Sequence, residues 1–335
     1  MTLAILWFAI IALLIAVYYV LDGFDLGVAV LMPFIAKTEG EKEALVRSVG
    51  PVWDGNEVWL LTAGGALFAA FPPAYATSFS GFYLAIMLVL FGLIVRAVSM
   101  EFRTYDRKWR KLWDALFFVG SLVPALLFGV ALGNCLQGIP LAENGDYAGT
   151  FFGLLTPFPL VCGVLGLATI VMQGACWLSA KIEQGSDLQL RAKRLRAIMQ
   201  IVTVVLVFAT SLLFFFVVHA RFAEGPAFVI AIIATVVLLV ALVVGFLASS
   251  RNRDWVAFIA SSLVCVSLVA LFASSIFPNL IVSTGPGPSI DIASAASSDL
   301  SLTVMTVVAC IGVPLVIVYH ILVYRTFRGR IEVEK

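Results

Sequence analysis

Charged residues are scarce in this sequence: 12% of its 335 residues are Asp, Glu, Lys or Arg, while 62% are hydrophobic. Soluble domains carry roughly 25% charged residues. The shortage therefore argues against a soluble fold and indicates a chain that is solvated mainly by lipid. The formal net charge of +1 suggests neither a nucleic-acid partner nor an acidic substrate.

Histidine and closely spaced cysteine are also rare. The five cysteines lie far apart and form no C-x-x-C pair, so we expect neither a disulfide framework nor a metal site. The two histidines, His219 and His320, fall near opposite ends of two apolar runs. One haem cannot easily be ligated from opposite faces of a membrane. We therefore expect interfacial or hydrogen-bonded histidines and no haem-binding residue in this chain.

Long apolar runs dominate the sequence. A bilayer core about 30 Å thick requires roughly 20 apolar residues per helix. Nine runs meet this length, with a Glu224-Gly225-Pro226 turn separating the sixth from the seventh. The runs cover 3–35, 56–73, 78–100, 113–134, 151–180, 199–221, 226–248, 255–277 and 302–325. We predict an all-α integral membrane protein with nine transmembrane helices, forming a single membrane domain over 1–335.

The basic residues are distributed unequally between the two sides of this topology. Of the 21 Lys and Arg residues, 19 fall in alternate loops and the C-terminal tail. Arg221 lies on the other side, and Arg96 lies within the third helix. The positive-inside rule then predicts a periplasmic N-terminus and a cytoplasmic C-terminus.

Acidic residues at membrane depth are concentrated near the N-terminus. Tyr18, Asp22 and Asp25 are spaced i, i+4, i+7 in YYVLDGFDLGV, so they share one helical face. A span over 3–22 would place the acids at the cytoplasmic boundary, and a span over 16–35 would place them near the membrane centre. Two roles fit: local capping and hydrogen bonding around the neighbouring glycines, or a proton or ion path.

Two more acids, Asp54 and Glu57, occupy the first turns of the second helix in GPVWDGNEVWL. The helix N-terminus stabilises an anion by roughly 0.3–1 kcal/mol. Desolvation and neighbouring acids oppose that effect more strongly in a dry site. Such carboxyl groups can take and release protons near neutral pH, which suits a proton path open to the cytoplasm.

Arg96, the base within the third helix, has two interpretations. Its side chain could snorkel to the cytoplasmic interface. Alternatively, it could be a structural counter-ion for one of the acids on the first two helices, or for Glu101. Trp53 and Trp59 flank Asp54, where Trp commonly marks the membrane interface.

Three segments in the first hundred residues closely resemble subunit II of the cytochrome bd quinol oxidases. They are LDGFDLGV at 21–28, GPVWDGNEVWLLTAGGALFAAFPPAYA at 50–76 and SGFYLAIMLVLFGLIVRAV at 80–98. The short chain and compact loops are similar to the branch that includes cyanide-insensitive oxidases. The resemblance implies two four-helix bundles plus one peripheral helix. We assign 1–134 to the first bundle, 151–180 to the peripheral helix and 199–325 to the second bundle.

The resemblance also implies a function. The chain would be the non-haem subunit of a quinol:O₂ oxidoreductase of the bacterial inner membrane, which reduces O₂ to water with electrons from quinol. A homologous subunit I would carry two haems b, one haem d and the quinol site, so no cofactor is expected on this chain alone. Membrane lipids, quinone and a small single-helix accessory subunit are the other partners that we consider, and no nucleic acid is expected.

The family's proton-path aspartate matches Asp54 by motif position, with Asp22, Asp25 and Glu57 as neighbouring acids. Trp53 and Arg96 also match motif positions, and we add Tyr18 as a supporting residue. No catalytic residue is expected in this chain. Two alternatives stay open: an ion-coupled secondary transporter using the same acids, and a purely structural subunit that stabilises a haem-bearing partner.

Overall fold

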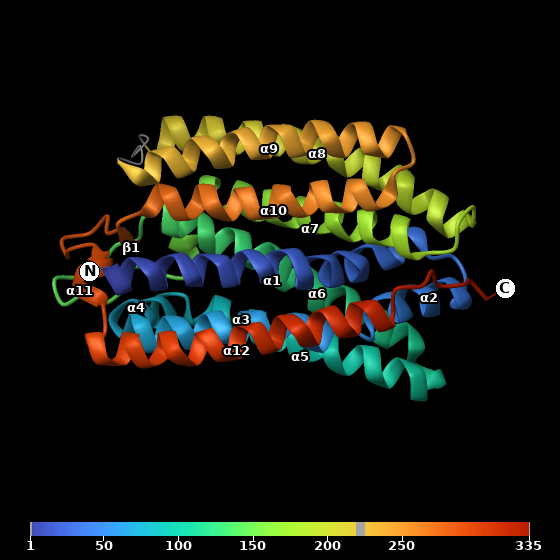
Figure 1. Cartoon of the computed structure of the whole chain (residues 1–335), viewed down its shortest axis with the longest axis horizontal. Helices are drawn as coiled ribbons and strands as arrows, with labels where there is room; N and C mark the ends of the chain where they lie inside the picture. Colours follow the sequence, from blue (N-terminus) through green and yellow to red (C-terminus); the bar gives the residue numbers. More distant parts are fainter. Residues whose placement is uncertain (1, 219–224, 335) are drawn as a thin grey trace.

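The computed structural model describes residues 2–218 and 225–334 of the chain. His219, Arg221 and Glu224, which enter the sequence predictions, lie outside the described residues. The described chain is almost wholly helical, and its long helices lie side by side as roughly parallel rods (Figure 1). The all-helical prediction is confirmed.

The first half of the chain forms six helices. They are α1 (Thr2–Ile35), α2 (Glu39–Val49), α3 (Trp53–Ala70), α4 (Pro72–Gly81), α5 (Tyr83–Tyr105) and α6 (Arg110–Gln137). A 3₁₀ turn, η1 (Arg107–Trp109), precedes α6. Phe71 separates α3 from α4 because the following Pro72 lacks an N–H and disfavours helical backbone in the residue before it.

The second half of the chain forms six more helices. They are α7 (Pro157–Lys181), α8 (Asp187–Val217), α9 (Pro226–Ser250), α10 (Asp254–Ile276), α11 (Ile292–Ala295) and α12 (Asp299–Thr326). A 3₁₀ turn, η2 (Phe152–Leu154), precedes α7, and two short antiparallel strands, β1 (Asn279–Ile281) and β2 (Ile290–Asp291), precede α11. These strands, α4 and α11 lie at the end of the rods that carries the N-terminus (Figure 1).

Eight helices in the described part of the chain are long and apolar enough to cross a membrane: α1, α5, α6, α7, α8, α9, α10 and α12. The protein is therefore a multi-pass membrane protein. The predicted span 56–73 corresponds to α3, whose 18 residues extend about 27 Å and include two carboxyl groups. The N-terminus and the C-terminus lie at opposite ends of the rods (Figure 1).

The centre of the molecule differs from the expected arrangement. We expected 151–180 to be a peripheral helix, but α7 is the most buried span, with 72% of its apolar stretch buried. Only 6% of the corresponding stretch of α12 is buried, and α12 lies at the edge, beside α3 (Figure 1). That expectation came from the family resemblance, and the sequence could not correct it, because membrane helices are apolar on all sides and hydrophobicity does not identify the buried face.

Close packing explains the central position of α7. At Gly27 of α1 and Gly174 of α7 the two backbones touch, and a Cβ on Gly174 would lie 2.5 Å from the carbonyl carbon of Gly27. Small residues allow such approaches between membrane helices. Gln173, fully buried on α7, donates to the Val20 carbonyl of α1 at 3.3 Å and to Ser262 of α10 at 2.8 Å.

Helix α8 begins earlier than predicted. The expected span started at residue 199, with the basic residues before it in a loop, but α8 starts at Asp187. The Ser186 hydroxyl caps the helix by accepting from the backbone N–H of Gln189 at 3.2 Å. The basic segment 191–196 therefore forms the first turns of a helix that extends beyond its apolar part.

Ion pairs connect the basic loops and the tail at one end of the rods, here called the basic end. It comprises α2, the α5–α6 junction, the first turns of α8 and the tail 327–334. Three of the pairs are Lys42–Asp114 at 2.7 Å, Arg103–Asp114 at 2.6 Å and Arg47–Glu334 at 3.3 Å. The basic residues thus gather at one end, as their distribution in the sequence predicts.

Candidate functional site

The polar face predicted on α1 is buried inside the helix bundle. Asp22 is 0% exposed, Asp25 is 2% exposed, and Tyr18 is also buried one turn before Asp22. Helix α1 is continuous over 34 residues, about 51 Å, so it exceeds the hydrocarbon thickness of a bilayer. The two aspartates therefore face protein and not lipid, as expected for carboxyl groups at membrane depth.

Arg96 of α5 joins this face to α3. Its guanidinium, 0% exposed, lies 2.7 Å from Asp22 Oδ1 and 3.0 Å from Glu57 Oε2. The guanidinium carbon also lies 5.9 Å from the centre of the Trp53 ring, within the range of a cation–π interaction. The geometry matches the counter-ion interpretation of Arg96 and not the snorkelling one, while Glu101 is exposed.

Asp25 has a different partner, which the sequence predictions missed. The amide Nδ2 of Asn56 donates to Asp25 Oδ2 at 2.7 Å, and Asn56 is fully buried. The hydroxyl of Tyr324, on α12, donates to Asn56 Oδ1 at 2.9 Å. Asp25 Oδ1 and Asp22 Oδ2 have no hydrogen-bond partner among the described residues. We call Asp22, Asp25, Asn56, Glu57 and Arg96 the acid cluster.

The acid cluster lies inward from the basic end. Arg103 comes seven residues after Arg96 on α5, which corresponds to about 10 Å along the helix. Arg103 pairs with Asp114 and with Glu39, in the first turn of α2. The cluster is therefore separated from the ion pairs of Arg103 by about two turns of helix.

The charges within the acid cluster do not balance. One guanidinium faces three carboxyl groups, and it pairs with only two of them. A buried carboxylate without a cation costs several kcal/mol, so the site can lower its energy by holding protons. Glu57 is the member nearest the surface, with a side chain that is 21% exposed. The arrangement can accept, hold and release protons inside the helix bundle.

Asp54 lies outside the acid cluster. We expected it to share a dry site with the other acids, but its side chain is exposed one turn before Glu57 on α3. It forms no ion pair within the described part of the chain. In this chain alone, Asp54 therefore occupies the outer surface of α3 near its N-terminus.

His320 is held by hydrogen bonds on both ring nitrogens. Trp59 Nε1 donates to His320 Nε2 at 3.2 Å, and His320 Nδ1 lies 2.9 Å from the Val316 carbonyl, to which it donates. The prediction of a hydrogen-bonded histidine is confirmed for His320, whereas His219 lies outside the described residues. The described residues contain no cluster of three or more His, Cys, Asp or Glu that could hold a metal ion.

A second buried ion pair joins α8 to α10 at the basic end. Arg196, 1% exposed, lies 2.8 Å from Asp254, and Lys193 lies 3.3 Å from the same carboxyl group. The sequence predictions treated these bases as loop residues. Here both cations face one carboxylate, in contrast to the acid cluster, so this ion pair connects α8 to α10 and has no unpaired carboxyl group.

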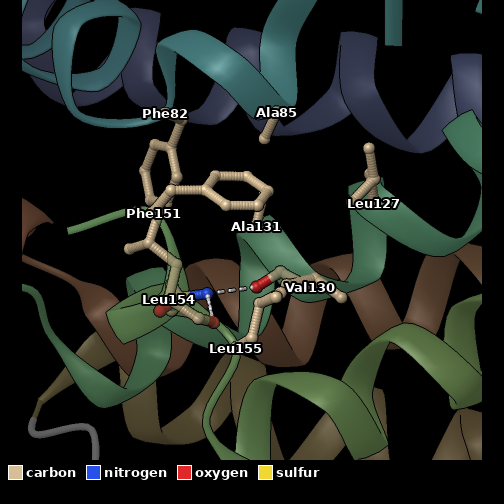
Figure 2. Close-up of a pocket in the computed structure, with 9 residues that line it drawn as sticks. Phe82, Ala85, Leu127, Val130, Ala131, Phe151, Leu154 and Leu155 are labelled. Carbon is tan, nitrogen blue, oxygen red and sulfur yellow. Dashed lines mark hydrogen bonds between the residues drawn. The ribbon is translucent and has the colours of Figure 1, made fainter. Parts of the chain in front are cut away.

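An apolar pocket is lined by residues of α5, α6 and η2, among them Ala85, Val130 and Leu154 (Figure 2). Asn134 is its polar group and donates to the carbonyls of Val130 and Leu154 at 2.9 and 2.8 Å. Ala85, on its wall, precedes Arg96 by about 17 Å along α5. With its amide hydrogens engaged and a volume of about 10 Å³, this pocket offers no chemistry comparable to the acid cluster.

The chain is similar to known proteins over almost its whole length. Residues 3–327 match the family described as "Cytochrome bd terminal oxidase subunit II". The "Probable cytochrome oxidase subunit 2" of Haemophilus influenzae is 36% identical, over 98% of this chain and 95% of that protein. The "Cytochrome bd-I ubiquinol oxidase subunit 2" of Escherichia coli is 34% identical, over 99% and 96%.

A solved structure supports the fold. "The structure of bd oxidase from Geobacillus thermodenitrificans" superposes with a TM-score of 0.82, covering 98% of this chain and 99% of that one. Sequence identity in this match is 17%, so the match supports a shared fold and nothing further.

Proposed function

This chain belongs to the cytochrome bd terminal oxidase subunit II family and is a subunit of a quinol oxidase complex. We propose that it supplies protons to the oxygen-reducing site of subunit I. The observation that carries the proposal is the acid cluster, in which one buried guanidinium faces three carboxyl groups. Reduction of O₂ to water consumes protons. A buried group of carboxyls that can exchange protons meets that need.

We further propose nine membrane spans in a single membrane domain, with α3 and α4 together supplying the span that is less apolar than the other eight. An odd number of spans fits the position of the two termini at opposite ends of the rods (Figure 1). By the positive-inside rule the basic end faces the cytoplasm and the N-terminus faces the periplasm of a bacterial inner membrane. Protons would then enter from the cytoplasm.

The exposed position of Asp54 suggests where subunit I binds. A carboxyl group on an outer helical surface near the membrane is costly unless protein or water covers it. Asp54 and the partly exposed Glu57 lie one turn apart on α3. We propose that this surface of α3 contacts subunit I, so that Asp54 and Glu57 lie between the partner and the buried Asp22 and Asp25.

The family implies haem in the complex, and the described residues of this chain do not fit a haem ligand set. To bind iron through Nε2, His320 would have to give up the hydrogen bond that it accepts from Trp59. We therefore propose that subunit I holds the two haems b, the haem d and the quinol site, with membrane lipid around both subunits. A small single-helix accessory subunit remains part of the proposed assembly.

The test is Asp25→Asn in the assembled two-subunit oxidase. We expect oxygen consumption to fall by about 10²-fold, the loss typical of a removed proton-transfer group, while the haem spectrum is unchanged. Asp54→Asn should also slow turnover. Asp299→Asn is the matched control, because Asp299 is an exposed carboxyl in the first turn of α12. Wild-type oxygen consumption with retained haem in both Asp25→Asn and Asp54→Asn would overturn the proton-supply role.

A further inference from the structure

A cavity lies at the basic end, beside Tyr324 of α12. Its volume for the centres of water molecules is about 80 Å³, enough for several waters. The walls come from the α2–α3 junction, the last turn of α7, the end of α12 and the tail. Its lining includes Arg47, Ser48, Lys181, Tyr324, Phe327 and Ile331.

The wall formed by the tail is fixed by hydrogen bonds. Lys181 Nζ donates to the carbonyl of Gly329 at 3.0 Å and also to that of Phe327. The backbone N–H of Ile331 donates to the Lys181 carbonyl at 2.8 Å, and Arg330 donates to the Ile182 carbonyl at 2.8 Å. The C-terminal tail is therefore held against the end of α7 and forms a fixed side of the cavity.

Tyr324 stands between this cavity and the acid cluster. Tyr324 lines the cavity, and its hydroxyl donates to Asn56 Oδ1. The opposite side of the same amide donates to Asp25 Oδ2. The amide Nδ2 also donates to the Leu21 carbonyl at 3.4 Å, so acceptors on α1 hold one end of the amide and the Tyr324 hydroxyl holds the other. Two hydrogen bonds therefore connect Tyr324, at the cavity, to Asp25 by way of Asn56.

We propose that this cavity is an aqueous proton entrance contained within this chain, and that Tyr324 is a positioning residue that acts on Asp25 through Asn56. The inference rests on the proposed function of the acid cluster and adds an approach that does not pass Asp54. Water in the cavity brings the proton to the Tyr324–Asn56 pair. The amide holds Asp25 Oδ2, which leaves the unpartnered Oδ1 to receive the proton.

An amide does not itself relay protons readily, since transfer would require its less stable imidic acid form. The pair therefore acts as an orienting link, and a water molecule must reach Asp25 beside it. Filling the cavity should stop that water, whereas loss of the Tyr324 hydroxyl should leave Asn56 Oδ1 without its donor and hold the amide less firmly. The two perturbations address the same entrance by independent means.

The first experiment fills the cavity in the folded complex. Ile331→Cys is introduced with Cys310, the exposed native cysteine, replaced by Ser, and the assembled oxidase is treated with benzyl methanethiosulfonate. We expect oxygen consumption to fall about tenfold or more, while anaerobic reduction of the haems by quinol keeps its rate. Glu334→Cys, exposed and farther along the same tail, is the matched control and should lose no activity on labelling.

The second experiment removes one hydroxyl. Tyr324→Phe should slow oxygen consumption about threefold to tenfold, the effect of one lost buried hydrogen bond, and should change the solvent deuterium isotope effect. Anaerobic haem reduction should again be unchanged, which a merely structural defect would not allow. Tyr319→Phe is the control, because Tyr319 lies on α12 near Tyr324 and its hydroxyl makes no hydrogen bond with the described residues.

The outcomes separate this inference from the proposed function. Loss of turnover in Asp25→Asn, with wild-type turnover in Tyr324→Phe and in labelled Ile331→Cys, would overturn the entrance and leave the Asp54 surface as the route. Full turnover in Asp25→Asn would instead overturn the proton role of the cluster itself. Slowing in both perturbed proteins, with both controls unaffected, would establish the entrance.

Discussion

Replacing Arg96 by Met should destabilise the protein strongly, because it leaves a buried carboxyl without its cation. Arg96 and Asp22 are both 0% exposed and lie 2.7 Å apart, whereas Glu57, at 21% exposed, can turn toward a more polar surface. Breaking a buried pair by removing one partner costs about 3–5 kcal/mol. We expect Arg96→Met to lower the free energy of unfolding by about this amount, mostly through Asp22.

The same geometry predicts a recovery when both charges are removed. Asp22→Leu on the Arg96→Met background should restore part of the loss, with a coupling free energy of about 2–3 kcal/mol between the two positions. The assay is unfolding of the purified complex by dodecyl sulfate in mixed micelles, followed by tryptophan fluorescence, for wild type, both single variants and the double variant.

Arg107→Met serves as the control for loss of a positive charge. Arg107 is exposed in the α5–α6 junction and forms no ion pair with the described residues, so its replacement should change the free energy of unfolding by about 0.5 kcal/mol or less. An Arg96→Met variant as stable as Arg107→Met would refute the reasoning. Full additivity of the Arg96 and Asp22 substitutions would refute it equally.

Two further predictions concern helix packing and the basic end. Gly174→Ala should lower the free energy of unfolding by about 1–3 kcal/mol, because its methyl group would lie 2.5 Å from the Gly27 backbone. The measurement is the temperature at which the complex loses haem, which should fall. Gly245→Ala is the control: its methyl group would meet only ordinary contacts from 3.4 Å, so this temperature should not change. Burial opposes ionisation of Glu41, but hydrogen bonds from a backbone N–H and from Arg191 outweigh it and lower the pKa of Glu41. Its stabilisation is therefore present above the ordinary value of about 4.5 and is lost as pH falls through the folded pKa. Glu41→Gln should lower the melting temperature at pH 7 and have a smaller effect near pH 3. An equal effect of Glu41→Gln at both pH values would contradict the pairing.

Much of the helical architecture follows from the sequence because a bilayer imposes length and apolarity on each span. The apolar runs coincide with long helices, and the gathering of bases at one end follows from charge alone. The family prediction, made from residues 21–28, 50–76 and 80–98, is confirmed by the match over 3–327. The positions of α7 and α12 could not be predicted, because apolarity on all sides of a membrane helix hides which face is buried.

The acid cluster was predictable only in part. The spacing of Tyr18, Asp22 and Asp25 places them on one face of α1 without tertiary information. The contact of Asn56 with Asp25, 31 positions apart, depends on how α3 crosses α1. The link from Asn56 to Tyr324 depends on how α12 packs against α3, 268 positions away. Such contacts between distant helices leave no periodic signal in one sequence.

The most direct test of proton supply measures proton uptake itself. The fully reduced two-subunit oxidase is mixed with O₂ in the presence of a pH-sensitive dye, and proton uptake and haem oxidation are followed in the same reaction. If the acid cluster supplies the protons, Asp25→Asn should slow uptake and the proton-dependent part of haem oxidation by the same factor, about 10²-fold. Uptake and haem oxidation at wild-type rates in Asp25→Asn would contradict the account.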